Sequence, residues 1–329
     1  MVHDVLERLL RSHSPQALHE MGREWRAEQI RALLLSYLEE KMGGAQEKPK
    51  RFSYQFARLS VVLEEVVDRL CAEFLQSSFE PADFELRIDK DGLVAPYALP
   101  LPDGGTLQIK GSIDRVDRME RDGKAYLRVV DYKSGGKEFL LSDVLNGLNM
   151  QMLIYLMCLW QNGAERYGEV IPAGILYMPV KSTPATLGRD ATQAEIDKAR
   201  AKACRMSGMV LDHSLVIDGM EADGKGIFIP ARREKDGGVK GTLINLAQLS
   251  RLQKKMDGIL TEMGESLHRG EIGAVPSFGA GYDRVCDWCD YKSVCGYEPG
   301  APVRPIEKLT HTQSLERLEN LGKEEPRHG

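Results

Sequence analysis

The residues of this chain best suited to chemistry lie in two consecutive strand-like segments. In the second, VVDYK, Asp131 and Lys133 are two positions apart, so both side chains project from the same face of a strand. The first, GSIDRVD, contains Asp114, and the turn signal Asp122-Gly123 predicts an antiparallel pair that brings Asp114 toward Asp131. Two carboxylates on an apolar sheet raise each other's pKa unless a cation lies between them. The pattern therefore indicates a site for a hard divalent ion such as Mg²⁺.

A third candidate segment, QMLIY, follows the second strand after a short connector. Its Gln151 and Tyr155 are four residues apart, so on a helix both leave one face and can return polar groups to the same site. Each pattern also has an ordinary structural explanation. An Asp-x-Lys on a strand is most often a solvated edge, and Gln151 and Tyr155 fit polar positions on a half-buried helix. Only residue types, order and spacing together favour catalysis.

Hydrophobic periodicity and turn residues indicate the elements that must position these groups. The first eighty residues are predicted to be helical, with a clear helical repeat over 56–79 and a polar connector at 43–51. From position 84 the pattern changes to four strand-like segments separated by Asp-Gly turn signals, which predicts an antiparallel meander.

Further helices and strands alternate through the second half. They are predicted as a helix at about 143–161, a buried strand at 173–180, a basic helix at 192–207, strands at 210–217 and 226–230, a turn at 236–238, and an amphipathic helix at about 246–269. This order of elements indicates an α/β or α+β fold.

Length and composition place the chain among globular proteins. It has 329 residues, with 42% hydrophobic and 28% charged, which excludes disordered and fibrous classes. The net charge of −5 disfavours a protein that coats DNA, but not a nuclease whose carboxylates surround a metal. No apolar run could span a membrane, and Asp4 and Glu7 lie where a signal peptide would be apolar, so we expect a cytoplasmic protein with no membrane partner.

The ordered set GSIDRVD, VVDYKSG and QMLIY resembles the signature of the RecB-type PD-(D/E)xK nucleases, and within them the AddB-type nuclease domains. Similarity extends to HDVLERLL, RMSGMVLDHSLVI and VCDWCDYKSVCGYEP, and so covers most of the chain. The resemblance implies an α/β (α+β) restriction-endonuclease-like core, in which helices flank a mixed central sheet. A helical N-terminal segment and a cysteine-rich C-terminal loop would complete it.

The resemblance also implies roles for individual residues. Asp114 and Asp131 match the family's metal-ligand carboxylates, Lys133 its catalytic lysine, and His3 a further metal ligand on the first helix. The pair Gln151 and Tyr155 matches the helix motif that orients the lysine and the scissile phosphate. A weaker match places Glu85 at an accessory acidic position. No DNA-contacting residue is assigned; basic residues at 198–205, Arg232, Arg233, Lys235 and Lys240 fit either a strand-binding channel or a solvated face.

The implied activity is that of a Mg²⁺- or Mn²⁺-dependent deoxyribonuclease, an exonuclease in double-strand break processing and recombinational repair. Its implied partners are DNA, especially single strands, and an AddA-like helicase-nuclease subunit in the bacterial cytosol or nucleoid. Two alternatives stay open. One is a catalytically silent DNA-binding or scaffold module; the other is a Cas4-like nuclease, which the long segment between Lys181 and the clustered cysteines disfavours.

Three cysteines are clustered as Cys286-x2-Cys289-x5-Cys295, which suits a metal centre better than a disulfide framework. Zinc sites and cubane clusters need a fourth ligand. The resemblance implies a 4Fe-4S cluster completed by a cysteine upstream of the His3 helix, so we expect an incomplete or absent cluster, or a smaller ion in its place. A helix-end histidine, His268, is a less favoured substitute, and buried thiols are expected at Cys71, Cys158 and Cys204.

These features predict four parts of the chain. They are an N-terminal helical part of the nuclease domain at 1–80, a nuclease core with an inserted basic region at 81–272, a cysteine-rich metal or iron-sulfur segment at 273–300, and a polar tail at 301–329.

Overall fold

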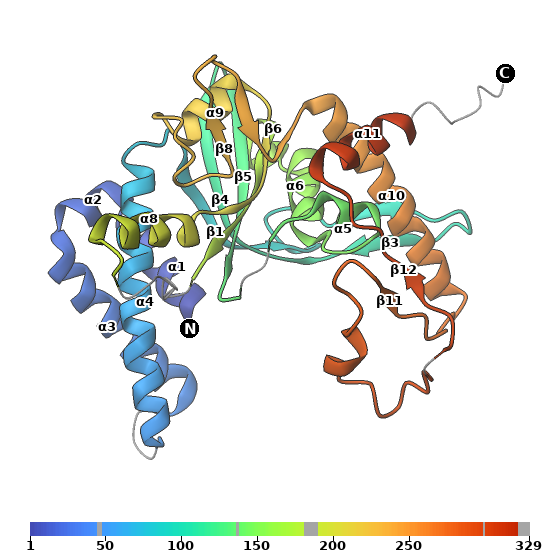
Figure 1. Cartoon of the computed structure of the whole chain (residues 1–329), viewed down its shortest axis with the longest axis horizontal. Helices are drawn as coiled ribbons and strands as arrows, with labels where there is room; N and C mark the ends of the chain where they lie inside the picture. The colour runs from blue at the N-terminus through green and yellow to red at the C-terminus, as the bar shows by residue number, and fades with distance from the viewer. Residues whose placement is uncertain (45–47, 136–137, 181–189, 299, 322–329) are drawn as a thin grey trace.

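A mixed six-stranded sheet runs through the middle of the molecule, with helices on both faces (Figure 1). The computed structural model describes residues 1–44, 48–135, 138–180, 190–298 and 300–321. In sheet order the strands are β1 (Glu80–Ile88), β4 (Gly111–Arg121), β5 (Lys124–Lys133), β6 (Glu169–Pro179), β7 (Ser207–Leu211) and β10 (Leu243–Ile244). The pairs β5–β6 and β7–β10 are parallel and the other neighbours antiparallel. This confirms the predicted fold class.

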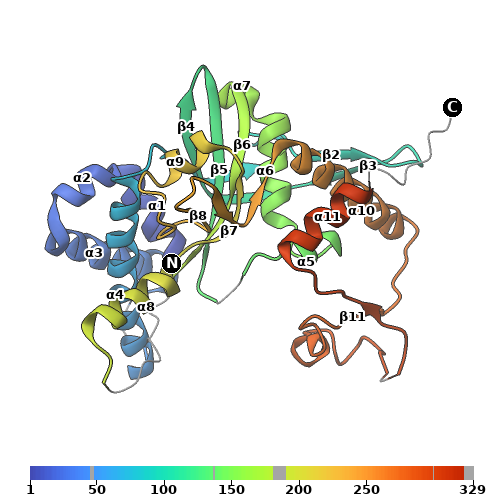
Figure 2. The same cartoon turned by 45° about the horizontal axis from the view of Figure 1, so that its top comes forward.

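One face of the sheet is covered mainly by the N-terminal helices and the other by helices that follow β5 in the chain (Figure 2). The first group is α1 (Val2–Ser12), α2 (Pro15–Glu20), α3 (Gly22–Met42) and α4 (Lys50–Phe74), joined by α9 (Ser214–Met220). The second is α5 (Leu141–Leu145), α6 (Gln151–Asn162), α10 (Leu246–His268) and α11 (His311–Leu321). Each group buries its apolar stripe against the sheet, which gives two hydrophobic cores back to back.

Smaller elements lie outside the six-stranded sheet. Three two-stranded sheets are formed by β2 (Tyr97–Pro100) with β3 (Thr106–Ile109), β8 (Ala231–Arg233) with β9 (Val239–Gly241), and β11 (Ser277–Phe278) with β12 (Arg304–Pro305). The remaining helices are α7 (Ala164–Tyr167), α8 (Gln193–Cys204) and the 3-10 turn η1 (Val285–Trp288). Within the described ranges, none of the helices has the length and apolar composition that crossing a membrane requires.

Several predicted elements differ in the structure. The meander is not one sheet, because β2 and β3 pair only with each other. The predicted helix at 143–161 is divided into α5 and α6, between which Gly147 and Asn149 take positive φ angles of 72° and 52°. The predicted strand at 210–217 becomes the end of β7 followed by helix α9.

The predicted strand at 226–230 is also wrong, and a buried carboxylate explains why. Glu221 is 1% exposed, and its two oxygens accept hydrogen bonds from the backbone N–H groups of Ile227, Phe228 and Ile229 at 2.8–3.4 Å. These amides are therefore satisfied by a side chain instead of a neighbouring strand.

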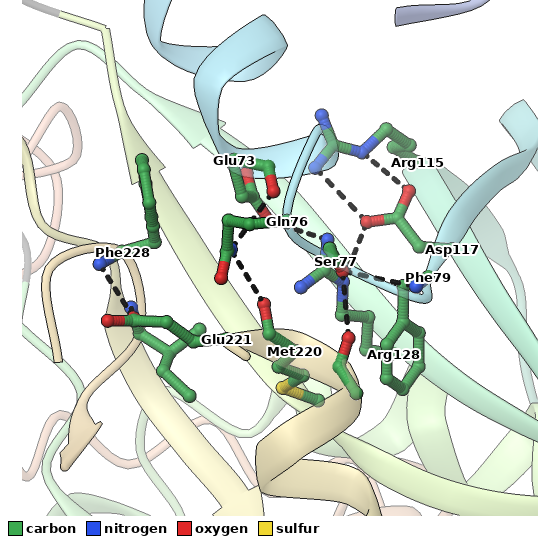
Figure 3. A network of polar contacts seen from close by, with 12 residues as sticks. Glu73, Gln76, Ser77, Phe79, Arg115, Asp117, Arg128, Met220, Glu221 and Phe228 are labelled. Atoms are coloured by element: carbon green, nitrogen blue, oxygen red, sulfur yellow. Dashed lines mark hydrogen bonds and ion pairs between the residues drawn. The ribbon is translucent and has the colours of Figure 1, made fainter. Parts of the chain in front are cut away.

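A buried network of four charged side chains links α4 to the central strands (Figure 3). Asp117 on β4 contacts both arginines, with 2.8 Å from its Oδ1 to Arg115 Nε and 2.8 Å from its Oδ2 to Arg128 Nε. Arg128 also donates to Glu73 Oε1 of α4 at 2.6 Å. All four residues are at most 1% exposed, and Phe74 packs against both guanidinium groups. The two positive and two negative charges compensate each other inside the core, which makes their burial tolerable.

Candidate active site

The strands β4 and β5 separate where the sequence places its two carboxylates. Their antiparallel pairing runs from Arg121 opposite Lys124 to Arg115 opposite Val130 and then stops. By the same register, Asp114 and Asp131 would be the next pair. Instead, the backbone N–H of Tyr132 donates to Asp114 Oδ2 at 3.0 Å. A side chain thus takes the place of a strand acceptor and fixes the Asp114 carboxylate at the opening between the strands.

A histidine from α1 and a glutamate from β1 join Asp114 there. His3 Nδ1 lies 3.5 Å from Asp114 Oδ2 and 3.6 Å from Glu85 Oε1. One potential ligand atom from each of the three residues lies within 4.8 Å of the others. The hydroxyl of Ser112 donates to the other Glu85 oxygen at 3.1 Å. The predicted ligands His3 and Asp114 are therefore together, and the weakly matched Glu85 joins them, whereas Asp131, the third predicted ligand, lies outside this group.

Glu85 also has an unusual backbone. Its φ is 46°, in the left-handed region that non-glycine residues rarely adopt, although it lies within strand β1. Such strain persists only where surrounding contacts hold it, and it often occurs at functional sites. Here the contacts with His3 and Ser112 supply that restraint.

The Asp-x-Lys motif forms a close ion pair. Lys133 Nζ lies 2.7 Å from Asp131 Oδ2, with the side chains 30% and 9% exposed. The same amine lies 5.9 Å from the centre of the Tyr177 ring on the neighbouring strand. The contact between the two side chains confirms that they share one face of β5.

The charge distribution suits a divalent cation. Burial raises the pKa of the Asp114 carboxyl, and the nearby charges of Asp131 and Glu85 raise it further, while Tyr132 N–H and His3 oppose them. Asp131 Oδ2 is buried and, apart from Lys133, accepts no hydrogen bond from the described residues. These carboxylate oxygens have few cationic neighbours and lie near one imidazole. A hard divalent ion would stabilise such a set of ligand atoms. The residues present therefore fit such an ion.

The helix motif lies beside the start of β4. Gln151 Nε2 donates to the Tyr155 hydroxyl at 3.1 Å, which confirms that the two side chains share a face of α6. The Tyr155 hydroxyl packs so tightly on Gly111 that a Cβ atom there would lie only 2.4 Å away. Within the described chain, no hydrogen bond joins either residue to Asp131 or Lys133. Their role at the site stays a prediction.

Two further residues support the site and were not found from the sequence. The Tyr132 ring lies 5.6 Å from the His3 ring, centre to centre. Its hydroxyl accepts a hydrogen bond from Arg115 of the buried network at 2.9 Å. Alternation along β5 does place Tyr132 on the α1 face. Nothing in the sequence, however, signals that Arg115 is buried beneath it.

The clustered cysteines are not assembled into a metal-ligand group. Cys289 and Cys295 are exposed and Cys286 is half-buried, and in the described ranges the only group of potential ligands within 4.8 Å is the one at His3. His268, the less favoured substitute ligand, instead contacts Asp103 of the β2–β3 turn.

We expect the cysteines to differ sharply in reactivity. Burial raises the pKa of Cys158 to about 11 and also raises the pKa of Cys71. A thiol with a pKa near 11 is about 0.1% thiolate at pH ~8, and the thiolate is the reactive form. Iodoacetamide should therefore modify Cys289 and Cys295 in the folded protein long before Cys71 and Cys158, as measured by peptide mass spectrometry. Denatured protein, in which all six should react alike, is the control. Equal labelling of Cys158 and Cys289 in the folded protein would contradict the burial described above.

Comparison with known proteins shows which family and which proteins the chain is similar to. A family model described as "PD-(D/E)XK nuclease superfamily" matches residues 1–296. The chain is 31% identical over 304 residues to a subunit of the ATP-dependent helicase/deoxyribonuclease of Acetivibrio thermocellus, and 32% identical over 305 residues to the corresponding protein from Clostridium botulinum strain Hall. Each match covers 90% of this chain but 26% of the relative. The chain thus spans about a quarter of the length of these curated relatives.

Proposed function

Because the chain belongs to the PD-(D/E)XK nuclease superfamily, whose members use divalent metals, we propose that it hydrolyses DNA phosphodiester bonds as the nuclease part of a longer helicase-nuclease. The observation that carries this proposal is the cluster of His3, Glu85 and Asp114 at the opening between β4 and β5, where Asp131 and Lys133 form their ion pair. The names of the relatives, which include a helicase and a deoxyribonuclease, support the choice of DNA as substrate.

Each residue at the opening has a proposed role. His3, Glu85, Asp114 and Asp131 would hold the metal ion, which when bound supplies a Lewis acid for the phosphate and acidifies a water molecule. Lys133 is a compact charge, held by Asp131, that positions the attacking water and stabilises the negative charge that develops on the phosphate. The Tyr132 ring, 5.6 Å from the His3 ring, would help to orient it. Gln151 and Tyr155 would help to orient Lys133 and the scissile phosphate.

Finer features of this function are also proposed. The ion would be Mg²⁺, the substrate a single strand cut as an exonuclease does, the partner an AddA-like helicase subunit, and the location the bacterial cytosol. Cys286, Cys289 and Cys295 would contribute to a 4Fe-4S cluster only if a fourth ligand is supplied from elsewhere. The four-part division at 1–80, 81–272, 273–300 and 301–329 also stays a prediction.

The test is cleavage of end-labelled single-stranded DNA by the purified chain, with Mg²⁺, with Mn²⁺, and with a chelator. We expect shortened products with either metal and none with the chelator. Asp131→Asn, which removes a ligand charge at nearly constant shape, is the matched control and should be inactive. Equal DNA loss from the variant would reveal a contaminant or another site. Intact DNA under every metal condition would overturn the proposal and favour a silent scaffold module.

A further inference from the structure

A cavity of about 450 Å³ opens directly beside Lys133, between the end of β5, strands β6 and β7, and the end of α8. Among the described residues that line it, Lys133, Lys202 and Arg205 are cationic and Glu138 is the one carboxylate. Lys133 is already paired with Asp131, and Lys202 and Arg205 against Glu138 leave a net positive charge that favours an anionic occupant.

The floor of this cavity differs from its rim. Phe139, Tyr177 and Met206 line its inner side and are at most 8% exposed, so they close the cavity from below the charged side chains. Lys202 and Arg205 at the rim are exposed, and in the described part of the chain neither forms an ion pair with a carboxylate. Exposed cations beside a cavity attract the phosphate groups of a nucleic-acid strand.

We propose that this cavity is a subsite for one unpaired nucleotide of the DNA strand, next to the phosphate that is cut. Its volume lies within the range of about 300–1,000 Å³ that encloses small ligands. A base that is still paired would have to enter with its partner strand attached, which a cavity of this size excludes. Because Lys133 lines the cavity and also pairs with Asp131 of the proposed site, a strand bound in the cavity would lie next to the proposed reacting groups.

This inference rests on the proposed function and deepens it, because it gives a structural reason for a preference for single strands. The two basic residues of the rim lie at the end of helix α8 and before β7, within the predicted inserted basic region. The basic residues of this segment differ in position. Lys202 and Arg205 line the cavity, whereas Lys198, which is also exposed and lies on α8, does not line it.

Binding without metal tests the subsite independently of cleavage. The anisotropy of a fluorescein-labelled 12-nucleotide single strand is titrated with the whole chain in EDTA, over a series of salt concentrations. The double variant Lys202→Ala/Arg205→Ala should raise Kd at least about fivefold. It should also reduce the slope of log Kd against log salt by about 1.4, because each lost contact with a single-strand phosphate contributes about 0.7. Lys198→Ala, the matched control, should change Kd less than about twofold.

A blunt duplex of the same sequence separates the subsite from general charge attraction. We expect the double variant to bind this duplex within about twofold of the wild-type protein. Equal weakening for duplex and single strand, or an equal effect of Lys198→Ala, would overturn the subsite. So would an unchanged Kd for the single strand in the double variant. A wild-type chain that binds single strands in this way but does not cut them with Mg²⁺ would refute the nuclease proposal and leave the subsite standing.

Discussion

Lys133→Ala is expected to slow DNA cleavage by about 10²–10³-fold, the usual loss when a preorganised group that stabilises transition-state charge is removed. The amine lies 2.7 Å from Asp131, which directly follows the last β5 residue paired with β4 and whose charge acts on Asp114. Alanine keeps the strand but removes the positive charge. Single-turnover cleavage of end-labelled single-stranded DNA at saturating Mg²⁺ measures the change in the chemical step.

A metal-binding readout distinguishes the lysine from the ligands. A ligand that binds only the folded protein raises its melting temperature. Mg²⁺ should therefore still stabilise Lys133→Ala, whereas Asp114→Asn should lose most of this shift along with activity. If Lys133→Ala cut DNA at the wild-type rate, or lost its response to Mg²⁺, the role assigned to the amine would be wrong.

Asp117→Asn is expected to cost about 3–5 kcal/mol of unfolding free energy, because it leaves buried guanidinium groups without their carboxylate. Asp117 is fully buried and contacts both Arg115 and Arg128. After the change Arg128 keeps Glu73, but Arg115 keeps only the Tyr132 hydroxyl. Urea unfolding followed by circular dichroism measures the difference.

The chain offers a matched control on its surface. Asp218 pairs with Arg233, and the two side chains are 46% and 35% exposed. The same substitution there, Asp218→Asn, should cost less than about 1 kcal/mol, because water solvates both partners. If Asp117→Asn does not fold, Glu73→Gln provides a milder test, since it removes one of the two carboxylates and leaves Asp117 between the arginines. A loss no larger than that of Asp218→Asn in the buried variants would show that the network does not contribute as described.

Much of the candidate site followed from local periodicity. Two-residue alternation placed Asp131 and Lys133 on one face, and four-residue spacing paired Gln151 with Tyr155; both contacts are present. The N-terminal helices and the long helix α10 were also predicted correctly, since each has a sustained apolar stripe.

The predictions that failed depended on contacts that local sequence patterns do not reveal. The segment 226–230 looks like a strand, but its amides bond to the Glu221 carboxylate. The short apolar run that became α9 is compatible with either helix or strand, and only packing decides. Charged residues are expected at the surface, so neither the burial of Arg115 nor its support of Tyr132 could be predicted.

The pairing of β11 with β12 has a consequence for the cysteine-bearing stretch. Ser277 lies opposite Arg304, and the Arg304 guanidinium donates to the Ser277 hydroxyl at 2.9 Å, so the two ends of the intervening stretch meet. Near its start, the Tyr282 hydroxyl donates to Asp143 of helix α5 at 2.9 Å. The stretch is thus a loop whose two ends are held together by the paired strands β11 and β12, which form its base. An engineer could graft a shorter hairpin or a different metal-binding loop onto that base without redesigning the sheet.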